Sequence, residues 1–258
     1  MPAWSVSAFS HRGLVRPVNE DAVAIDGKIL TGDMDKPCRC DVTASSCLLM
    51  IADGMGGHAH GALASKTVLD HLIADADRLS DPKSCSGAIG AANKYLFGMM
   101  PEQPENSGMG TTLVGVSLTT DALVMFNVGD SRCYRFGSSG FSQLSHDDVS
   151  STTKDTSGHR RSHAITQCLG GSPFFIPVEP HVRADVPLTD DETILLCSDG
   201  LTDMVQDPTI ASIMANAGDC TQAVRNLAAA ALQAGGADNL SIVVARAINS
   251  FPISNPEI

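Results

Sequence analysis

The chain has 258 residues, 43% of them hydrophobic and 18% charged, and its 29 acidic against 17 basic side chains give a formal net charge of −12. This composition indicates one folded domain with a sizeable core, and it argues against nucleic acid as a partner because a negative surface repels a polyanion. No apolar run reaches the length of a membrane span, and the first residues lack the pattern of a signal peptide. We therefore expect a cytoplasmic protein that does not associate with membranes.

Short apolar segments with strand character recur along the chain. Several are rich in Val, Ile and Thr or alternate with a period of two. Two of them are separated only by Thr119, Thr120 and Asp121, which is typical of an antiparallel hairpin. The predicted strands are 3–9, 47–52, 112–118, 122–128, 132–136, 193–198 and 240–247, with a further strand after Asp21.

Two pairs of helices interrupt these strands, at 60–79 with 85–99 and at 207–216 with 219–234. Their apolar residues recur at helical spacing, and Gly235 ends the last one. Antiparallel strands with helices in separate pairs indicate an α+β layered domain over residues 1–250. The segments 27–46 and 145–163 are polar and irregular, and 251–258 reads as a terminal tail.

Eight cysteines are scattered through the chain, mostly within apolar segments. Only Cys38 and Cys40 are close in sequence, and their C-x-C spacing is not that of a zinc site. We expect reduced, buried thiols.

Acidic residues stand at one end of nearly every strong predicted strand. Asp53 follows one strand in "IADGMGG" and Asp199 follows another in "LLCSDGLTD", each directly before a glycine. The remaining members of the set are Glu20, Asp21, Asp130, Asp203 and Asp238, with Asn239 beside the last. Each acid alone is explained by turn chemistry. As a set they are not, because antiparallel strands bring several such ends together, where unpaired carboxylates repel and divalent cations relieve the repulsion. Oxygen ligands favour Mg²⁺ or Mn²⁺.

Seven ordered segments carry a family resemblance: "RGLVRPVNEDA", "ADGMGGHAHGALAS", "GMGTTL", "VGDSRCYRF", "ITQCLGG", "CSDGLTDMV" and "GADNLSIVV". In this order the chain resembles the metal-dependent PPM (PP2C-type) Ser/Thr protein phosphatases in their bacterial form. The resemblance implies a four-layer α-β-β-α sandwich of two antiparallel sheets flanked by helix pairs. It also implies a monomeric enzyme that hydrolyses phosphoserine and phosphothreonine in a phosphoprotein, in opposition to a Ser/Thr kinase.

The resemblance assigns roles to individual residues. Asp53 would bridge two Mn²⁺ or Mg²⁺ ions, the Gly54 carbonyl would ligate one of them, and Asp199 with Asp238 would complete the first ion's set. Glu20 and Asp21 would hold metal-bound waters, with Asn239 beside Asp238. Asp130, with Asp199 or Asp203, would form the site of a third ion.

The implied reaction is direct attack on the phosphate by a hydroxide that bridges two metal ions, without a phosphoenzyme. Arg16 is the candidate phosphate clamp, because a guanidinium binds phosphate oxygens in bidentate fashion. His58 is a candidate general acid for the leaving alkoxide, and an ordinary loop histidine is an equally good interpretation.

The chain departs from the family pattern at three places. His11 and Asp148 replace an aspartate and a histidine, and the flap, here about 148–164, is short. A short flap suggests a more open cleft, beside which Arg160 and Arg161 would be a solvated basic pair or a contact for an acidic substrate.

Two other functions stay open on the sequence. One is a binding module that keeps the fold without catalysis, which is disfavoured because no metal-binding acid has been lost. The other is a metal-dependent phosphoesterase for small molecules, because metals and Arg16 recognise the phosphate group alone.

Overall fold

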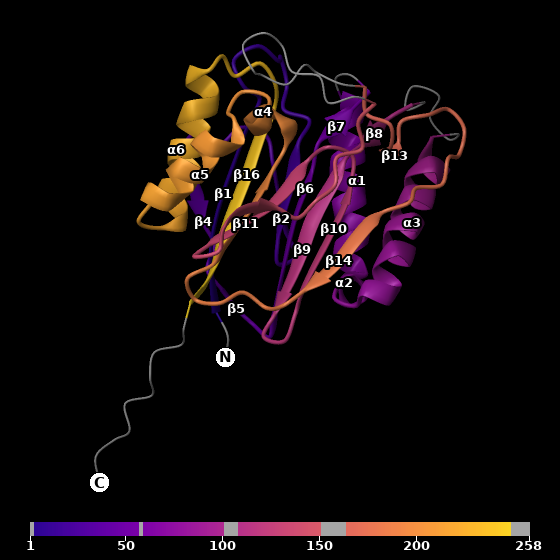
Figure 1. The fold of residues 1–258 in the computed structure, drawn as a ribbon. Helices are drawn as coiled ribbons and strands as arrows, with labels where there is room; N and C mark the ends of the chain where they lie inside the picture. The colour runs from indigo at the N-terminus through magenta and orange to yellow at the C-terminus, as the bar shows by residue number, and fades with distance from the viewer. Residues whose placement is uncertain (1–2, 57–58, 101–107, 151–163, 249–258) are drawn as a thin grey trace.

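The computed structural model describes residues 3–56, 59–100, 108–150 and 164–248. Three antiparallel sheets and six helices make up these residues (Figure 1). The first sheet has the order β12 (Gly140–Gln143), β11 (Arg132–Gly137), β15 (Thr193–Cys197), β16 (Leu240–Ile248), β1 (Ala3–His11) and β4 (Cys38–Arg39), and β5 (Val42–Thr43) also pairs with β1. The second has the order β14 (His181–Asp185), β10 (Leu123–Val128), β9 (Leu113–Thr119), β6 (Ser46–Ala52), β2 (Ala22–Ile25) and β3 (Lys28–Thr31).

A third, small sheet and the helices complete the fold. The small sheet joins β13 (Leu169–Gly170), β8 (Gly110–Thr111) and β7 (Gly54–Met55). The helices are α1 (Ala59–Ala74), α2 (Ala76–Leu79), α3 (Pro82–Met99), α4 (Asp199–Thr202), α5 (Asp207–Asn216) and α6 (Cys220–Gln233). Among the described residues, no helix combines the length and the apolar character that crossing a bilayer needs.

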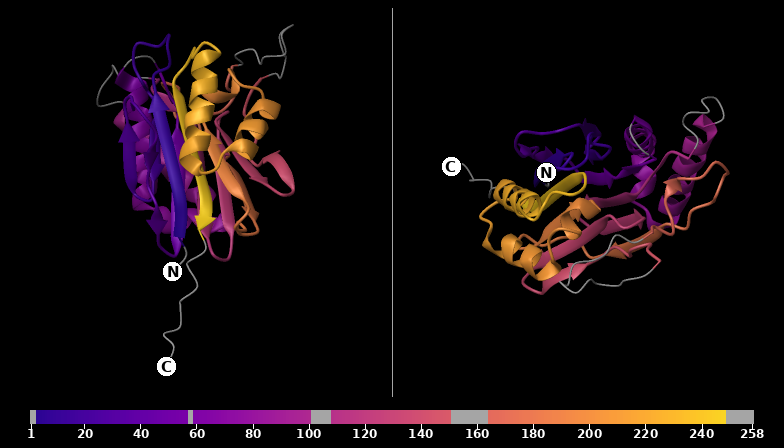
Figure 2. Two further views of the ribbon diagram at one scale, coloured as in Figure 1. Left: turned by 90° about the vertical axis from the view of Figure 1, so that its left-hand side faces the viewer. Right: turned by 90° about the horizontal axis from the view of Figure 1, so that it is seen from above.

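The sheets and helices stack in four layers, as the view from above shows (Figure 2). Strand β6 explains why: Cys47, Leu49 and Ile51 face the core between the two large sheets, while the alternate side chains face the core under α1 and α3. Strand β16 does the same on the other side, where its alternate residues pack under α5 and α6. The predicted α-β-β-α sandwich is confirmed.

Two local predictions are wrong. The predicted helix 60–79 is two helices, because the chain turns at Asp75, whose N–H donates to the Leu72 carbonyl at 3.1 Å. The segment 27–46 is not irregular, since it contributes β3, β4 and β5 to the sheet edges. Their two- to four-residue lengths leave no readable period. Most of the predicted flap and all of the tail 251–258 lie outside the described residues.

Candidate active site

Asp53 lies where the central strand β6 gives way to β7. Its N–H donates to Thr112 Oγ1 at 3.1 Å, and its carbonyl accepts from the Thr112 N–H at 2.9 Å and from Thr111 Oγ1 at 2.9 Å. Both threonines belong to the "GMGTTL" segment, which runs into the neighbouring strand β9. The Asp53 backbone is therefore fixed from the adjacent strand.

The glycine after each strand-end aspartate allows another backbone to approach closely. A Cβ on Gly54 would lie 2.5 Å from the Glu20 carbonyl oxygen, and one on Gly200 would lie 2.0 Å from the Asn239 carbonyl oxygen. Any larger residue would therefore push away the segments that carry the other acids. In both Asp-Gly pairs the glycine therefore allows close packing of another segment as well as a turn.

Asn239 fastens the loop before β2. Its Oδ1 accepts from the Glu20 N–H at 2.8 Å, and its Nδ2 donates to the Arg12 carbonyl at 3.2 Å and to the Val18 carbonyl at 2.9 Å. The Asn239 side chain is buried, and both its amide oxygen and its amide nitrogen form hydrogen bonds to this loop. Asn239 therefore orients the loop that presents Arg16, Glu20 and Asp21, a task that the sequence did not reveal.

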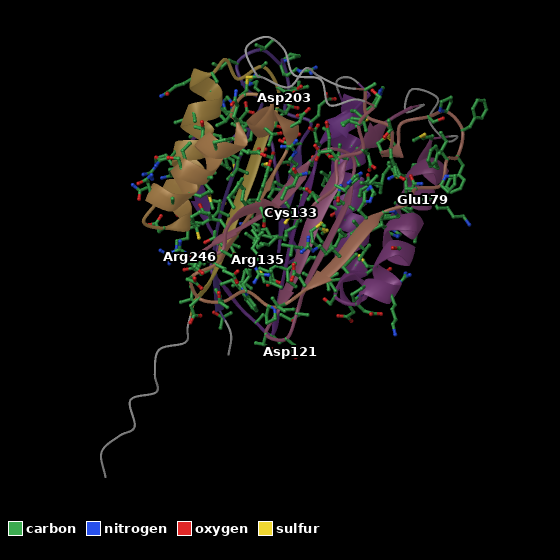
Figure 3. All side chains as sticks on the ribbon, in the orientation of Figure 1. Asp121, Cys133, Arg135, Glu179, Asp203 and Arg246 are labelled. Carbon is green, nitrogen blue, oxygen red and sulfur yellow. The ribbon has the colours of Figure 1, made fainter. Side chains whose placement is uncertain are left out.

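Asp21 and Asp199 lie at the ends of strands from opposite sheets, and Ser198, the residue before Asp199, bonds to Asp21. The Ser198 hydroxyl donates to Asp21 Oδ2 at 3.0 Å and accepts from the Ser241 N–H at 2.9 Å. Asp21 is 1% exposed, whereas Asp199 begins α4 and is partly exposed. Asp130 is buried in the β10–β11 turn, and Asp203 follows α4, near the upper edge in Figure 3.

The acids perturb one another. Burial and then the charges of Asp21, Asp199 and others hold the pKa of Asp53 well above its ordinary value. Burial, Asp130 and Asp238 do the same to the pKa of Asp199. Burial, partly offset by hydrogen bonds from Ser241 and Ser198, raises the pKa of Asp21 to about 6. The site therefore holds negative charge at an energetic cost.

Arg16 is a basic group that interacts with the acids of the site. Its Nη2 donates to Asp238 Oδ2 at 2.6 Å, and this contact, with smaller contributions from Asp199 and Asp53, raises the pKa of the guanidinium. The Arg16 side chain is 53% exposed, so its outer face is open to a ligand.

The donor chemistry fits a hard divalent cation. The predicted ligands are all oxygens, and Asp199 Oδ1 is buried with no hydrogen-bond partner among the described residues. A bound cation would relieve the repulsion that raises these pKa values. In the part of the chain that the structure describes, however, no three acidic, histidine or cysteine side chains already form a metal-ligand set. Asp238 is instead engaged by Arg16.

The other sequence predictions are distributed around this centre. His58 lies outside the described residues, as do Arg160 and Arg161. His11 Nδ1 accepts from the Gly13 N–H at 3.0 Å, which is a contact that an aspartate side chain also makes. Asp148 Oδ2 accepts from the Gly129 N–H at 2.8 Å and so steadies the turn that carries Asp130.

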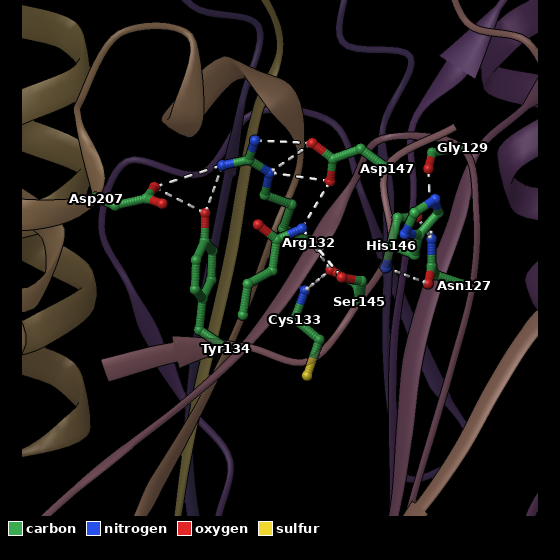
Figure 4. A network of polar contacts seen from close by, with 10 residues as sticks. Asn127, Gly129, Arg132, Cys133, Tyr134, Ser145, His146, Asp147 and Asp207 are labelled. Atoms are coloured by element: carbon green, nitrogen blue, oxygen red, sulfur yellow. Dashed lines mark hydrogen bonds and ion pairs between the residues drawn. The ribbon is translucent and has the colours of Figure 1, made fainter. Parts of the chain in front are cut away.

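A buried ionic network behind Asp130 was missed by sequence reasoning (Figure 4). Arg132 Nη2 donates to Asp147 Oδ2 at 2.7 Å, and Arg132 Nη1 donates to the Tyr134 hydroxyl at 2.7 Å. That hydroxyl donates to Asp207 Oδ1, at the start of α5, at 3.0 Å. The network ties strand β11 and the loop after β12, which carries Asp147, to the second helix pair. Its only signal in the sequence is the arginine of "VGDSR".

Comparison with known proteins agrees with this geometry. A family model described as protein phosphatase 2C matches residues 35–235. A Mycobacterium tuberculosis protein named Serine/threonine protein phosphatase PstP is 31% identical over 255 residues, which cover 94% of this chain and 45% of that protein. The chain thus spans about half of that relative's length. A Listeria welshimeri protein named Serine/threonine phosphatase stp is 28% identical, with 90% of this chain and 92% of that protein covered.

A solved structure extends the likeness to three dimensions. The catalytic domain of the serine threonine protein phosphatase PstP, in complex with two manganese ions, superposes with a TM-score of 0.75 at 30% identity, covering 96% of this chain and all of that one. The ordered motifs, the layered fold, the family match and this superposition agree: the chain belongs to the protein phosphatase 2C family.

Proposed function

We propose that this chain is a divalent-metal-dependent protein phosphatase that hydrolyses phosphoserine and phosphothreonine and opposes a Ser/Thr kinase. The observation that carries the proposal is the meeting of strand-end carboxylates from both sheets, above all Asp53, Asp199 and Asp238. Burial and the neighbouring carboxylates, Asp238 among them, hold the pKa values of Asp53 and Asp199 well above the ordinary value. The phosphatases named among its relatives support the same activity.

The proposed ligands are the Asp53, Asp199 and Asp238 carboxylates with the Gly54 carbonyl. Glu20 and Asp21 would receive hydrogen bonds from water in the site, and Asp130, with Asp199 or Asp203, would hold a third ion. When bound, Mn²⁺ or Mg²⁺ supplies Lewis-acid chemistry, because it lowers the pKa of water and stabilises charge on phosphoryl oxygens. The manganese ions of the related PstP structure support divalent metal use.

The chain's own residues position the phosphate. Arg16 would exchange its bond to Asp238 for the phosphate oxygens, and cation binding at Asp238 would favour this exchange because both compete for the same carboxylate. Asn239 and Ser198 keep the loop and the buried acid in place while this happens. His58 stays a predicted general acid.

The first test measures hydrolysis of p-nitrophenyl phosphate, of a phosphothreonine peptide and of free nucleotides with Mn²⁺, with Mg²⁺ and with chelator. Asp53→Asn removes one charge at the site, and Asp121→Asn removes the same charge from an exposed turn at the opposite end of the molecule (Figure 3). We expect metal-dependent turnover that only Asp53→Asn abolishes. No turnover with bound metal would indicate a binding module, and faster turnover of free nucleotides than of the peptide would indicate a small-molecule phosphoesterase.

A further inference from the structure

Cys38 and Cys40 form a close pair of thiols on the edge of the first sheet. Their Sγ atoms are 3.8 Å apart, within hydrogen-bond distance for sulfur. Both side chains are partly exposed and lie at the margin of the core between the sheets. The sequence-based expectation that these thiols are buried is therefore wrong for this pair.

The other six cysteines differ from this pair. Cys47, Cys85, Cys133, Cys197 and Cys220 are buried, which protects them from oxidants in solution. Cys168 is partly exposed, but its Sγ points to the Gly170 carbonyl oxygen at 3.8 Å and has no thiol partner. Accessible sulfur next to a second sulfur thus occurs at Cys38 and Cys40.

The backbone allows the two sulfurs to be joined. An extended strand rises about 3.3 Å per residue, so the Cα atoms of residues i and i+2 are about 6.6 Å apart. Disulfides span Cα separations of roughly 4.4–6.8 Å. The pair is therefore within reach of a bond but near the upper limit, and a bond at that limit is reduced easily.

We propose that Cys38 and Cys40 are a reversible redox dithiol that hydrogen peroxide closes to a disulfide within the chain. The Cys40 thiolate attacks one peroxide oxygen, the O–O bond breaks, and the departing hydroxide takes a proton to become water. The Cys38 sulfur then attacks the resulting sulfenic acid at Cys40, the S–O bond breaks, and the Cys38 proton leaves with the oxygen as a second water. Two thiols lose two electrons and two protons, and the peroxide becomes two waters.

The order of attack follows from the surroundings of the pair. Burial and the neighbouring Cys40 sulfur raise the pKa of the Cys38 thiol, which disfavours the Cys38 thiolate. Cys40 is then the sulfur that reacts first, and Cys38 is the one that resolves the intermediate.

The test counts thiols in the purified, reduced protein before and after a small excess of hydrogen peroxide. The protein is then denatured and alkylated with iodoacetamide, and its intact mass is measured. We expect the wild type to fall from eight alkylated cysteines to six and to return to eight after dithiothreitol. Trypsin cleaves after Arg39, between the two cysteines, so the oxidised sample should give one disulfide-linked peptide pair that separates on reduction.

Three variants make the test specific. Cys168→Ser removes the other accessible thiol and should still lose two thiols. Cys38→Ser should form no disulfide and should trap dimedone at Cys40, whereas Cys40→Ser should leave Cys38 a thiol. Eight alkylated cysteines after peroxide, loss of the disulfide in Cys168→Ser, or a bridge that joins either sulfur to another cysteine would overturn the proposal.

Discussion

The two Asp-Gly turns of the site share a dipeptide but not a local structure. Asp53-Gly54 follows the central strand β6 of one sheet and continues as the short strand β7, whereas Asp199-Gly200 follows β15 of the other sheet and opens helix α4. In both turns, the missing side chain of the glycine allows a backbone carbonyl of another acid-bearing segment to approach. What the turns have in common is therefore the close approach that they permit, and not the element that follows them.

Removing the acid of either turn should give the largest effect. Asp53→Asn and Asp199→Asn should each lower kcat at least roughly 100-fold, because a direct ligand should matter more than the outer partners, whose loss costs 10- to 100-fold. Steady-state kinetics with Mn²⁺ and a phosphothreonine peptide measures this, and circular dichroism checks that each variant is folded. If one variant kept full activity, the two turns would not belong to one site.

The clustered carboxylates of the site should make the stability of the metal-free protein depend on pH. The pKa of Asp21 is about 6 in the folded protein against an ordinary 3.8, so the folded state binds more protons than the unfolded state between these values. The contribution of Asp21 to the free energy of unfolding is therefore fully present below pH 3.8 and is lost as the pH rises through 6, a change of roughly 2–3 kcal/mol for this residue.

Thermal unfolding in chelator measures the decline across that pH range. Asp53 and Asp199 have pKa values shifted in the same direction and should steepen it. Asp21→Asn should flatten the decline, and Mn²⁺ should offset it by neutralising the site. A metal-free protein whose stability stayed constant from pH 4 to 7 would contradict the electrostatic description of the site.

The next largest effect is expected from adding a side chain to the glycine of either turn, where another backbone segment lies close. Gly54→Ala and Gly200→Ala should each destabilise the fold by roughly 1–3 kcal/mol or more, because the new Cβ meets backbone atoms that cannot move alone. Gly90→Ala in α3 is the control: nothing lies within 4 Å of its Cβ position, and the change should stabilise the protein by roughly 0.5–1 kcal/mol. Urea unfolding measures the free energy of unfolding of all three variants. If Gly200→Ala were as stable as the wild type, the glycines of the two turns would not have the same packing role.

The smallest effect is expected at His11. His11→Asp restores the family residue, and its carboxylate can accept the Gly13 N–H that His11 Nδ1 accepts now. We expect a change within about 0.5 kcal/mol in unfolding free energy, as for substitutions that keep their contacts. If urea unfolding showed a larger loss of unfolding free energy, the imidazole would make a stabilising contact besides the one to the Gly13 N–H.

Much of the fold could be predicted because β6, β9 and β16 are long enough to show a period, and because α3 and α6 carry a regular apolar face. The strands of 27–46 escaped because two to four residues carry too little pattern. The acids of the site were found through their place at the ends of predicted strands. The Arg132–Asp147 ion pair and the hydrogen bonds of Asn239 to the loop before β2 could not be predicted, because the bonded residues lie 15 or more positions apart along the chain.

By itself, the sequence determined which residues are acids at strand ends, where the glycines allow sharp turns, and which faces of the strands and helices are apolar. These are local properties of residue type and spacing. Only the tertiary structure decided that Asp21 is buried beside Ser198, that Arg16 meets Asp238, and that Cys38 and Cys40 reach the surface together. Burial and charge proximity depend on how distant segments pack, and these two quantities set the pKa values and reactivity of the groups.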